Sequence, residues 1–464
     1  MPAQTTSPAA PSLACTSILD NDLYKFTMQQ AVRQHYPNTP CDYHFTNRSP
    51  ELASLPLTAI PWLQSKIQAF ADLRLTGAER LFLEQRCPYL TKDYLDWLQH
   101  EFRFLPEQQI KIEWRPAAVG SSTATSQQPQ GMKPSTATAE SAVAKKTSVE
   151  ITIMGDWHQV ILYEVPILAL VSEAYYRFGD QDWDYDGQFE AAATKAERLV
   201  QSGALFAEFG TRRRRDYETQ RIVLEGLIAG SERARAAAAT DAGNLARSTK
   251  PGMLTGTSNL HFAHVMNLAP IGTMAHEWFM GTAAILKDAG PANEVALRRW
   301  AETFPGQVLG IALTDTFMTE TFLKTFKHDL ARDWIGVRHD SGDAFDFMDR
   351  IIQHYDQDSC VGPEMRKTKK IVFSDGLNTD LAIRLQQAAD QKGIQASFGI
   401  GTHFTNDYKH AQDPLKSTSV AMNIVIKLHS CNGQECVKLS DDHGKESGSP
   451  EAVARVKEQI AALV

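Results

Sequence analysis

The stretch Ile271–Trp278 places a histidine where a helix is expected to begin. An apolar segment ends here, a turn of small residues follows, and His276 falls in the first turn of the expected helix. The start of a helix leaves backbone N–H groups without intrahelical partners, and these groups favour anions. Because neutral imidazole is a good nucleophile near pH 7, His276 could receive a phosphoryl group there. The plainer interpretation of the same residues is a hydrogen-bonded histidine in a loop.

A second stretch, Glu208–Arg215, suits a flat anionic ring. Phe209 could stack on such a ring, while Arg212 or a neighbouring arginine takes a carboxylate in a planar fork. Four consecutive arginines cannot all face one pocket, so some of them must lie at the surface or in an interface. A basic surface run or a targeting patch is the alternative.

Polar and glycine-rich loops that could hold phosphate and ribose follow three later apolar runs. Arg338 and Asp340 have alternate spacing and therefore point the same way; Arg338 suits a phosphate, and Asp340 suits ribose hydroxyls or Mg²⁺. A structural salt bridge between the two is the alternative. The remaining loops have slim backbones that can wrap a phosphate, at Gly376 and at Gly399, Gly401 and Thr402.

These residues can meet only if the elements that carry them are arranged in one sheet. From about Tyr163, short apolar runs alternate with helical patterns, which predicts a parallel sheet covered on both faces. We expect an irregular, TIM-like α/β barrel, with an open doubly wound sheet as the competing arrangement. In both, the carboxyl ends of the strands form the site. The predicted strands lie at 204–210, 253–256, 308–315, 334–340, 371–376 and 396–402.

The chain before the barrel reads as a smaller α/β sandwich domain at 16–162. Asp20, Asn21 and Asp22 are candidate caps for a helix that continues to about Val32, and Asp42–Asn47 looks like a strand. The pattern over 61–100 is helical, and Leu81, Leu83, Tyr94, Trp97 and Leu98 are its expected packing residues. Two further strands, 109–114 and 149–154, flank a low-complexity stretch at 116–146 that we interpret as a disordered insertion.

Two further boundaries complete the predicted organisation of the chain. Residues 1–15 read as a disordered tail. The barrel domain is expected over 163–464, and its C-terminal segment could return to the N-terminal domain.

Composition narrows the class of protein. The 464 residues are 43% hydrophobic, which is enough for two domains and a large core, and the net charge of −8 argues against a nucleic-acid partner. The six cysteines are scattered without a Cys-x-x-Cys pair, as expected of free thiols in a reducing compartment. The sequence has no run of 18 apolar residues, so we expect no membrane span. We expect a cytoplasmic protein, with the nucleus as a further location.

Taken together, these motifs resemble those of the nicotinate phosphoribosyltransferase family. The matching tracts run in order from 19–28 through 208–213, 272–277, 338–343 and 374–376 to 398–402, and they cover most of the chain outside the tail and the insertion. The resemblance implies an N-terminal sandwich domain, an irregular barrel and a homodimer with a shared active site. It also implies a reaction of NAD salvage. Nicotinate, phosphoribosyl pyrophosphate, ATP and water give nicotinate mononucleotide, ADP, phosphate and pyrophosphate, with Mg²⁺.

The resemblance also implies roles for individual residues. The phosphohistidine of the family falls on His276. Its ring-stacking phenylalanine and base-side arginine fall on Phe209 and Arg212, and a tyrosine donated to the neighbouring subunit falls on Tyr24. The phosphate- and ribose-binding pair falls on Arg338 and Asp340, and the phosphate loops fall on Gly376 and 399–402.

Ser258 bears on the choice of ring substrate. The related nicotinamide-using enzyme has an aspartate where this chain has Ser258, and an aspartate would repel a carboxylate, so nicotinate is favoured. Nicotinamide or quinolinate phosphoribosyl transfer remain alternatives. Two more come from other classes: a catalytically silent metabolite sensor, and a barrel metallohydrolase whose ligands would be His261, His264, His339 and Asp340.

Overall fold

The computed structural model of the protein describes residues 12–116, 147–240, 250–357, 360–442 and 445–463. The insertion predicted at 116–146 lies outside these residues except for its first position, and so do residues 1–11 of the predicted tail. The last residues of that tail are ordered, because Ala14 and Cys15 are buried in the core. No helix of the described residues is long and apolar enough to cross a membrane.

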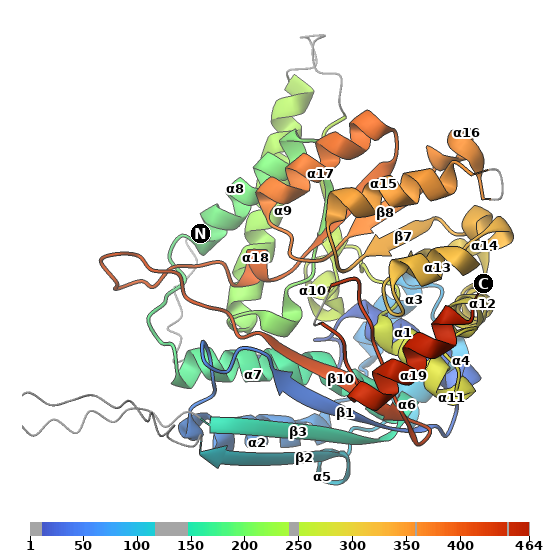
Figure 1. The fold of residues 1–464 in the computed structure, drawn as a ribbon. Helices are drawn as coiled ribbons and strands as arrows, with labels where there is room; N and C mark the ends of the chain where they lie inside the picture. The colour runs from blue at the N-terminus through green and yellow to red at the C-terminus, as the bar shows by residue number, and fades with distance from the viewer. Residues whose placement is uncertain (1–11, 117–146, 241–249, 358–359, 443–444, 464) are drawn as a thin grey trace, which may run out of the picture.

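The N-terminal part builds an antiparallel five-stranded sheet with helices around it (Figure 1). Its elements are α1 (Leu23–His35), β1 (Pro40–Asn47), α2 (Ile60–Gln68), α3 (Gly77–Arg86), α4 (Lys92–His100), α5 (Pro106–Gln109), β2 (Ile110–Pro116), β3 (Thr147–Asp156), α6 (Trp157–Val160) and α7 (Glu164–Phe178). The strand order is β11-β10-β1-β3-β2, so β10 (Ile424–Cys431) and β11 (Gln434–Glu435) come from the far end of the chain. The C-terminal segment therefore lies in the N-terminal sheet, beside β1.

The second part alternates strands and helices, as the sequence predicted. Its six strands are all parallel in the order β5-β4-β9-β8-β7-β6. The strands are β4 (Leu205–Glu208), β5 (Met253–Thr257), β6 (Ile311–Leu313), β7 (Gly336–His339), β8 (Lys370–Phe373) and β9 (Gln395–Ile400). The helices are α8 (Gln188–Gln201), α9 (Tyr217–Thr240), α10 (Leu260–Val265), α11 (His276–Leu286), α12 (Ala292–Thr303), α13 (Thr319–Thr325), α14 (His328–Asp333), α15 (Ala344–Tyr355), α16 (Gly362–Arg366), α17 (Thr379–Lys392), α18 (Thr402–Thr405) and α19 (Pro450–Ala461).

The barrel is irregular on the side between its two edge strands. Among the described residues no ladder joins β5 to β6. Instead, the segment that leads into α11 spans this side: Pro270 forms a parallel bridge with Thr257, the last residue of β5, and His276 reaches Thr316 beyond β6. The active-site histidine candidate therefore lies in the gap of the sheet.

Two expectations about the N-terminal helices are wrong in detail. Leu81 is 54% exposed, because α3 turns Phe82 and Leu83 to the core instead, whereas Leu83, Tyr94, Trp97 and Leu98 are buried as predicted. Asp22 does occupy the N-cap position of α1, but its side chain makes no capping hydrogen bond. The carboxylates of Asp20 and Asp22 are directed into the interior, where arginine and serine partners hold them.

Candidate active site

A cavity of about 1400 Å³ lies at the carboxyl ends of the barrel strands and extends to the N-terminal sheet. Side chains and loops from both parts of the chain line it. Ten of the predicted site residues are among them: Tyr24, Phe209, Arg212, His276, Arg338, Asp340, Gly376, Gly399, Gly401 and Thr402. Their convergence follows from the parallel sheet, because each follows the carboxyl end of a strand or lies on an element packed against that end.

His276 begins α11 and its imidazole is hydrogen-bonded at both nitrogens. Nδ1 lies 3.0 Å from Oγ1 of Thr316, and Nε2 lies 2.9 Å from Oδ2 of Asp340. Nε2 also lies 2.9 Å from Nζ of Lys438. Burial and the nearby Lys438 ammonium lower the pKa of His276, although Asp315 and Asp340 oppose this shift. The neutral, nucleophilic form of the imidazole is therefore favoured at neutral pH.

Lys438 and Asp315 were not predicted from the sequence. Nζ of Lys438 lies 3.0 Å from Oδ2 of Asp315, whose Oδ1 is buried without a hydrogen-bond partner. Asp315 follows β6 as Asp340 follows β7, so the repeated strand-end position could have identified it. Lys438 has no such signal, because it arrives on the segment after β11.

Arg338 and Asp340 form a salt bridge with each other, and both line the cavity. Nη2 of Arg338 donates to Oδ1 of Asp340 at 2.7 Å, and Nε donates to Oγ of Ser374 at 2.8 Å. Burial alone would raise the pKa of Asp340, but Arg338 and the hydrogen bond from His276 outweigh it and hold the pKa well below its ordinary value. The Asp340 carboxylate is therefore ionised, and it links His276 to Arg338 by contacting both side chains.

The four arginines after β4 have four different environments. Arg214 forms a buried two-pronged pair with Asp20, and Arg215 lies within an aromatic box of Tyr176, Trp183 and Tyr408. Arg213 donates to the backbone oxygen of Ile424. The Arg212 side chain is 45% exposed and lines the cavity; its salt bridge in the described part of the chain is a long one, to Glu164 at 3.6 Å. Arg212 is thus the arginine that is available to a ligand carboxylate, and the interpretation as a basic surface run is wrong for Arg214 and Arg215.

Gly399, in β9, and Gly401, which follows it, leave room for Phe209. A Cβ atom at Gly399 would lie 3.2 Å from Cδ2 of Phe209, and one at Gly401 would lie 2.9 Å from the Phe209 backbone oxygen. The absence of these side chains lets the ring lie against the β9 backbone. Gly376 differs, because its φ of +56° favours glycine and a Cβ there would meet open space.

Ser258 and Tyr24, two further predicted nicotinate contacts, have different positions relative to the cavity. Ser258 is fully buried and does not line the cavity; its hydroxyl donates to Oδ1 of Asp22, which does. The expectation that Ser258 contacts the ring directly is therefore corrected: Ser258 lies behind Asp22, which forms the cavity wall. Tyr24 lines the cavity of its own chain, and its implied contribution to the neighbouring subunit's site stays a prediction.

The metallohydrolase ligands do not gather. Nε2 of His261 lies 2.8 Å from the hydroxyl of Tyr217, the ring of His264 packs 4.9 Å from that of Phe82, and His339 bonds to the Gly342 backbone. Among the described residues, the candidate metal group that includes Asp340 is completed by His276 and Asp315 instead.

The cavity wall is strongly basic. Its cationic side chains outnumber its carboxylates, and they come from both parts of the chain. The cations are Arg48, Arg86, Arg212, Arg213, Arg338, Lys370, Lys427, Lys438 and Lys445. Such a wall suits a ligand with several phosphate groups.

Comparison with known proteins agrees with this geometry. The family model described as "Nicotinate phosphoribosyltransferase (NAPRTase) family" matches residues 204–462, and the model of its N-terminal domain matches residues 19–130. The chain belongs to the nicotinate phosphoribosyltransferase family. It is therefore an enzyme of the transferase class, from a family that acts in NAD biosynthesis.

Individual relatives match over nearly the whole chain. A Schizosaccharomyces pombe relative is 41% identical over 96% of this chain and 98% of its own length. The nicotinate phosphoribosyltransferase of Saccharomyces cerevisiae is 39% identical over 96% of this chain and 94% of its own length. A solved Saccharomyces cerevisiae structure superposes with a TM-score of 0.82 at 37% identity, covering 98% of this chain and 99% of the other. The predicted fold, an N-terminal domain joined to an irregular barrel, is thereby confirmed.

Proposed function

We propose that this chain transfers the phosphoribosyl group of phosphoribosyl pyrophosphate to the ring nitrogen of nicotinate and couples this step to ATP hydrolysis through a phosphohistidine at His276. One observation carries the coupled part of the proposal: a neutral imidazole stands between a lysine and a carboxylate in a basic cavity that also holds an aromatic ring and an available arginine. Family membership supports the two substrates.

Two sets of cavity residues suit the two halves of the transfer. The ring of Phe209 can stack on the pyridine ring, and Arg212 can pair with the carboxylate. The Arg212 charge favours nicotinate over nicotinamide, which carries no charge. Because the pyridine nitrogen is already a nucleophile, the transfer requires no general base. Departure of pyrophosphate leaves positive charge on the ribose, and the ionised Asp340 can stabilise that charge and hold the ribose hydroxyls.

The neighbours of His276 suit its proposed phosphorylation. Lys438 can donate to Nε2 only when that nitrogen carries no proton, which is the form in which it can attack the γ-phosphorus of ATP. The new N–P bond then forms as the bond to ADP breaks, and water later cleaves the N–P bond to release phosphate. Thr316, at Nδ1, holds the ring in place during both steps, whereas Asp340 can accept from Nε2 only while that nitrogen carries a proton.

The carboxylates of the cavity fit Mg²⁺. Oδ1 of Asp315 is buried without a hydrogen-bond partner, and ligand atoms of Asp315, Asp340 and His276 lie within 4.8 Å of one another. Such oxygens are the ligands that Mg²⁺ prefers. Asp315 and Asp340 would hold the ion, which would neutralise charge on the leaving pyrophosphate.

Replacement of His276 by asparagine tests the coupling. We expect His276→Asn to keep a slow, ATP-independent synthesis of nicotinate mononucleotide, to lose its stimulation by ATP, and to incorporate no acid-labile phosphate from γ-labelled ATP. His261→Asn, which changes a histidine outside the cavity, should keep both. Wild-type stimulation in His276→Asn would rule out the phosphohistidine.

Assays with nicotinate, nicotinamide and quinolinate side by side identify the ring substrate, and tight nicotinate binding without product would point to the sensor. We also propose a homodimer, which light scattering after gel filtration would test. The cytoplasm is the proposed location, supported by six cysteines that are all free.

A further inference from the structure

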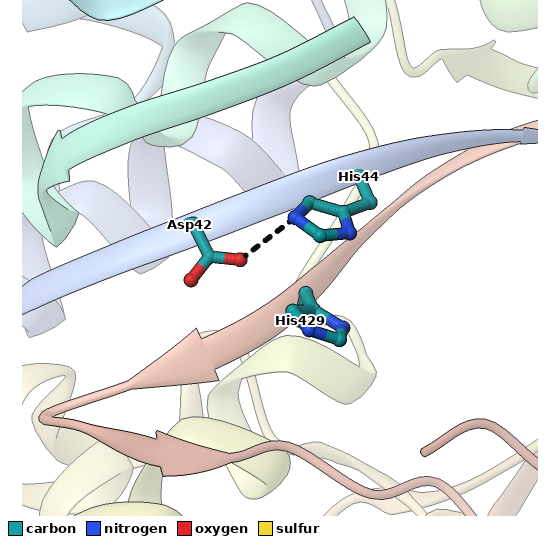
Figure 2. A group of neighbouring side chains, drawn as sticks. All are labelled: Asp42, His44 and His429. Atoms are coloured by element: carbon teal, nitrogen blue, oxygen red, sulfur yellow. Dashed lines mark ion pairs between the residues drawn. The ribbon is translucent and has the colours of Figure 1, made fainter. Parts of the chain in front are cut away.

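A group of metal-ligating side chains lies on the N-terminal sheet, outside the cavity. It consists of Asp42 and His44 on β1 and His429 on β10 (Figure 2). Oδ2 of Asp42 lies 3.1 Å from Nε2 of His44, and the two imidazole rings stack with their centroids 4.0 Å apart. One ligand atom from each of the three residues lies within 4.8 Å of the other two. None of the three lines the cavity described above.

A β-bulge brings His429 to this face. Asp42 pairs with Ser430, but the next residue, Tyr43, pairs with Leu428, so His429 is the extra residue of β10. In a regular ladder side chains alternate between the two faces, and His429 would then point away from its neighbour Ser430. A bulge re-aims one side chain. Here it places a second imidazole beside the Asp42–His44 pair.

Packing in the hydrophobic core does not account for Asp42, His44 and His429, because they lie on the other face of the sheet. The opposite face of the same strands carries Tyr43 and Leu428, which are 1% and 2% exposed. His44 and His429 are exposed, and Asp42 is half-buried. Oδ2 of Asp42 is nevertheless a buried atom without a hydrogen-bond partner, which leaves a carboxylate oxygen directed at the histidines.

The donor set determines the kind of ligand. Two imidazoles and one carboxylate suit a borderline metal such as Zn²⁺, Ni²⁺ or Co²⁺ rather than Mg²⁺ or Ca²⁺, which prefer oxygen ligands only. Tetrahedral ligands at about 2.0–2.1 Å from Zn²⁺ lie ~3.4 Å apart, so the three side chains must close slightly. The stacked rings must also turn, because a metal lies in the plane of each imidazole; both rings are exposed and have room to do so.

We propose that Asp42, His44 and His429 bind one divalent transition-metal ion of the Zn²⁺ class, with the fourth position open to water. The ion would join β1, near the start of the chain, to β10, near its end. It would thereby fasten the C-terminal segment to the N-terminal sheet, and with it Lys427 and Lys438 of the cavity wall. The site is additional to the proposed activity and does not depend on it.

Metal titration of the full-length, untagged, chelator-treated protein tests the site. We expect one equivalent of Zn²⁺ by calorimetry, a Co²⁺ complex with visible absorption typical of a four-coordinate site, and a higher midpoint of thermal unfolding with Zn²⁺. His44→Gln, His429→Gln and Asp42→Asn should each weaken Zn²⁺ binding by at least the ~10–100-fold that loss of an outer-shell partner costs. His100→Gln, which changes an exposed histidine at the end of α4, should bind Zn²⁺ as the wild type does.

Each other outcome overturns the proposal. Undiminished binding in the His44→Gln/His429→Gln double variant would show that the metal lies elsewhere. Binding that is lost only in His276→Gln would assign the metal to the cavity. Failure of the wild type to bind Zn²⁺ would show that the rings do not open. Because His44 and His429 are exposed, the variants should fold, which circular dichroism without metal would check.

Discussion

Nζ of Lys438 lies 2.9 Å from Nε2 of His276, although the two residues are 162 positions apart in the chain. The lysine arrives on the segment that follows the N-terminal sheet, whereas the histidine begins a helix of the barrel. The proposed phosphate acceptor is therefore completed only when the C-terminal segment has returned to β1.

Removal of the lysine charge should change the pH dependence of phosphorylation. The Lys438 ammonium lowers the pKa of His276, so Lys438→Met should let that pKa rise. A larger share of the imidazole is then protonated below neutral pH, and the rate of phosphate incorporation from labelled ATP should begin to fall at a higher pH than in the wild type. Lys445→Met removes a cavity lysine that pairs with Asp442 and not with His276. The pH at which its phosphorylation rate begins to fall should therefore equal that of the wild type. Superimposable profiles for Lys438→Met and wild type would contradict the assignment.

Arg212 should control the recognition of the carboxylate. Loss of one charge-assisted contact costs about 1.5–3 kcal/mol, so Arg212→Met should raise KM for nicotinate ~10–100-fold. The preference for nicotinate over nicotinamide should narrow by a similar factor, because nicotinamide has no charge to lose. Arg221→Met, which changes an arginine paired with Glu218 and Glu225 on α9, is the matched control in steady-state assays. An unchanged ratio of the two substrates would show that another group reads the carboxylate.

Gly399 should matter through the phenylalanine it supports. An added Cβ would lie 3.2 Å from the Phe209 ring, so Gly399→Ala should displace the ring and raise KM for nicotinate by roughly tenfold, the effect of a loss of about 1.4 kcal/mol. Thermal stability should change little if the ring moves into the cavity. Gly77→Ala adds a methyl group with no neighbour within 4 Å and should be silent in the same assay. Equal KM values for Gly399→Ala and wild type would mean that the ring has no part in binding.

The buried pair of Asp20 and Arg214 should give an acid-sensitive contribution to stability. Burial raises the pKa of Asp20, but Arg214 outweighs it and lowers the pKa from 3.8 to about 2. A carboxyl whose folded pKa is depressed stabilises the fold above its unfolded pKa, so this contribution of about 2 kcal/mol is present above about pH 4 and is lost as the pH falls towards 2.

Denaturant unfolding of Asp20→Asn against wild type measures this contribution. Near pH 6 the variant should be less stable by about 3–5 kcal/mol, since it leaves the Arg214 charge buried without its partner, and the difference should shrink as the pH falls. Asp93→Asn removes the exposed partner of Arg33 and should cost less than about 1 kcal/mol. A difference that stays constant from pH 6 to pH 3 would refute the role of ionised Asp20.

Periodicity and residue type were sufficient for the parallel strands and most of the cavity. Each apolar run with a polar end became a strand whose end faces the cavity, because a parallel sheet brings all its carboxyl ends to one edge. Predictions from the sequence were wrong where the position of a side chain depends on which other segment packs against it. The helical spacing of Leu81 does not say which side of α3 meets the core, and the run of arginines does not say that Arg214 and Arg215 have partners from other segments.

The amino-acid sequence alone determined the alternation of strands and helices, the residue types available for chemistry and the family resemblance, because these depend on local pattern. Only the tertiary structure decided that Ser258 stands behind Asp22, that Tyr24 lines the cavity of its own chain, and that Lys438 meets His276. These are contacts between distant segments, and their distances depend on how β10 pairs with β1 and how α11 fills the gap of the barrel. Neither arrangement can be predicted from the spacing of residues within one segment, because the free energy of pairing or packing depends on the side chains of both contacting segments.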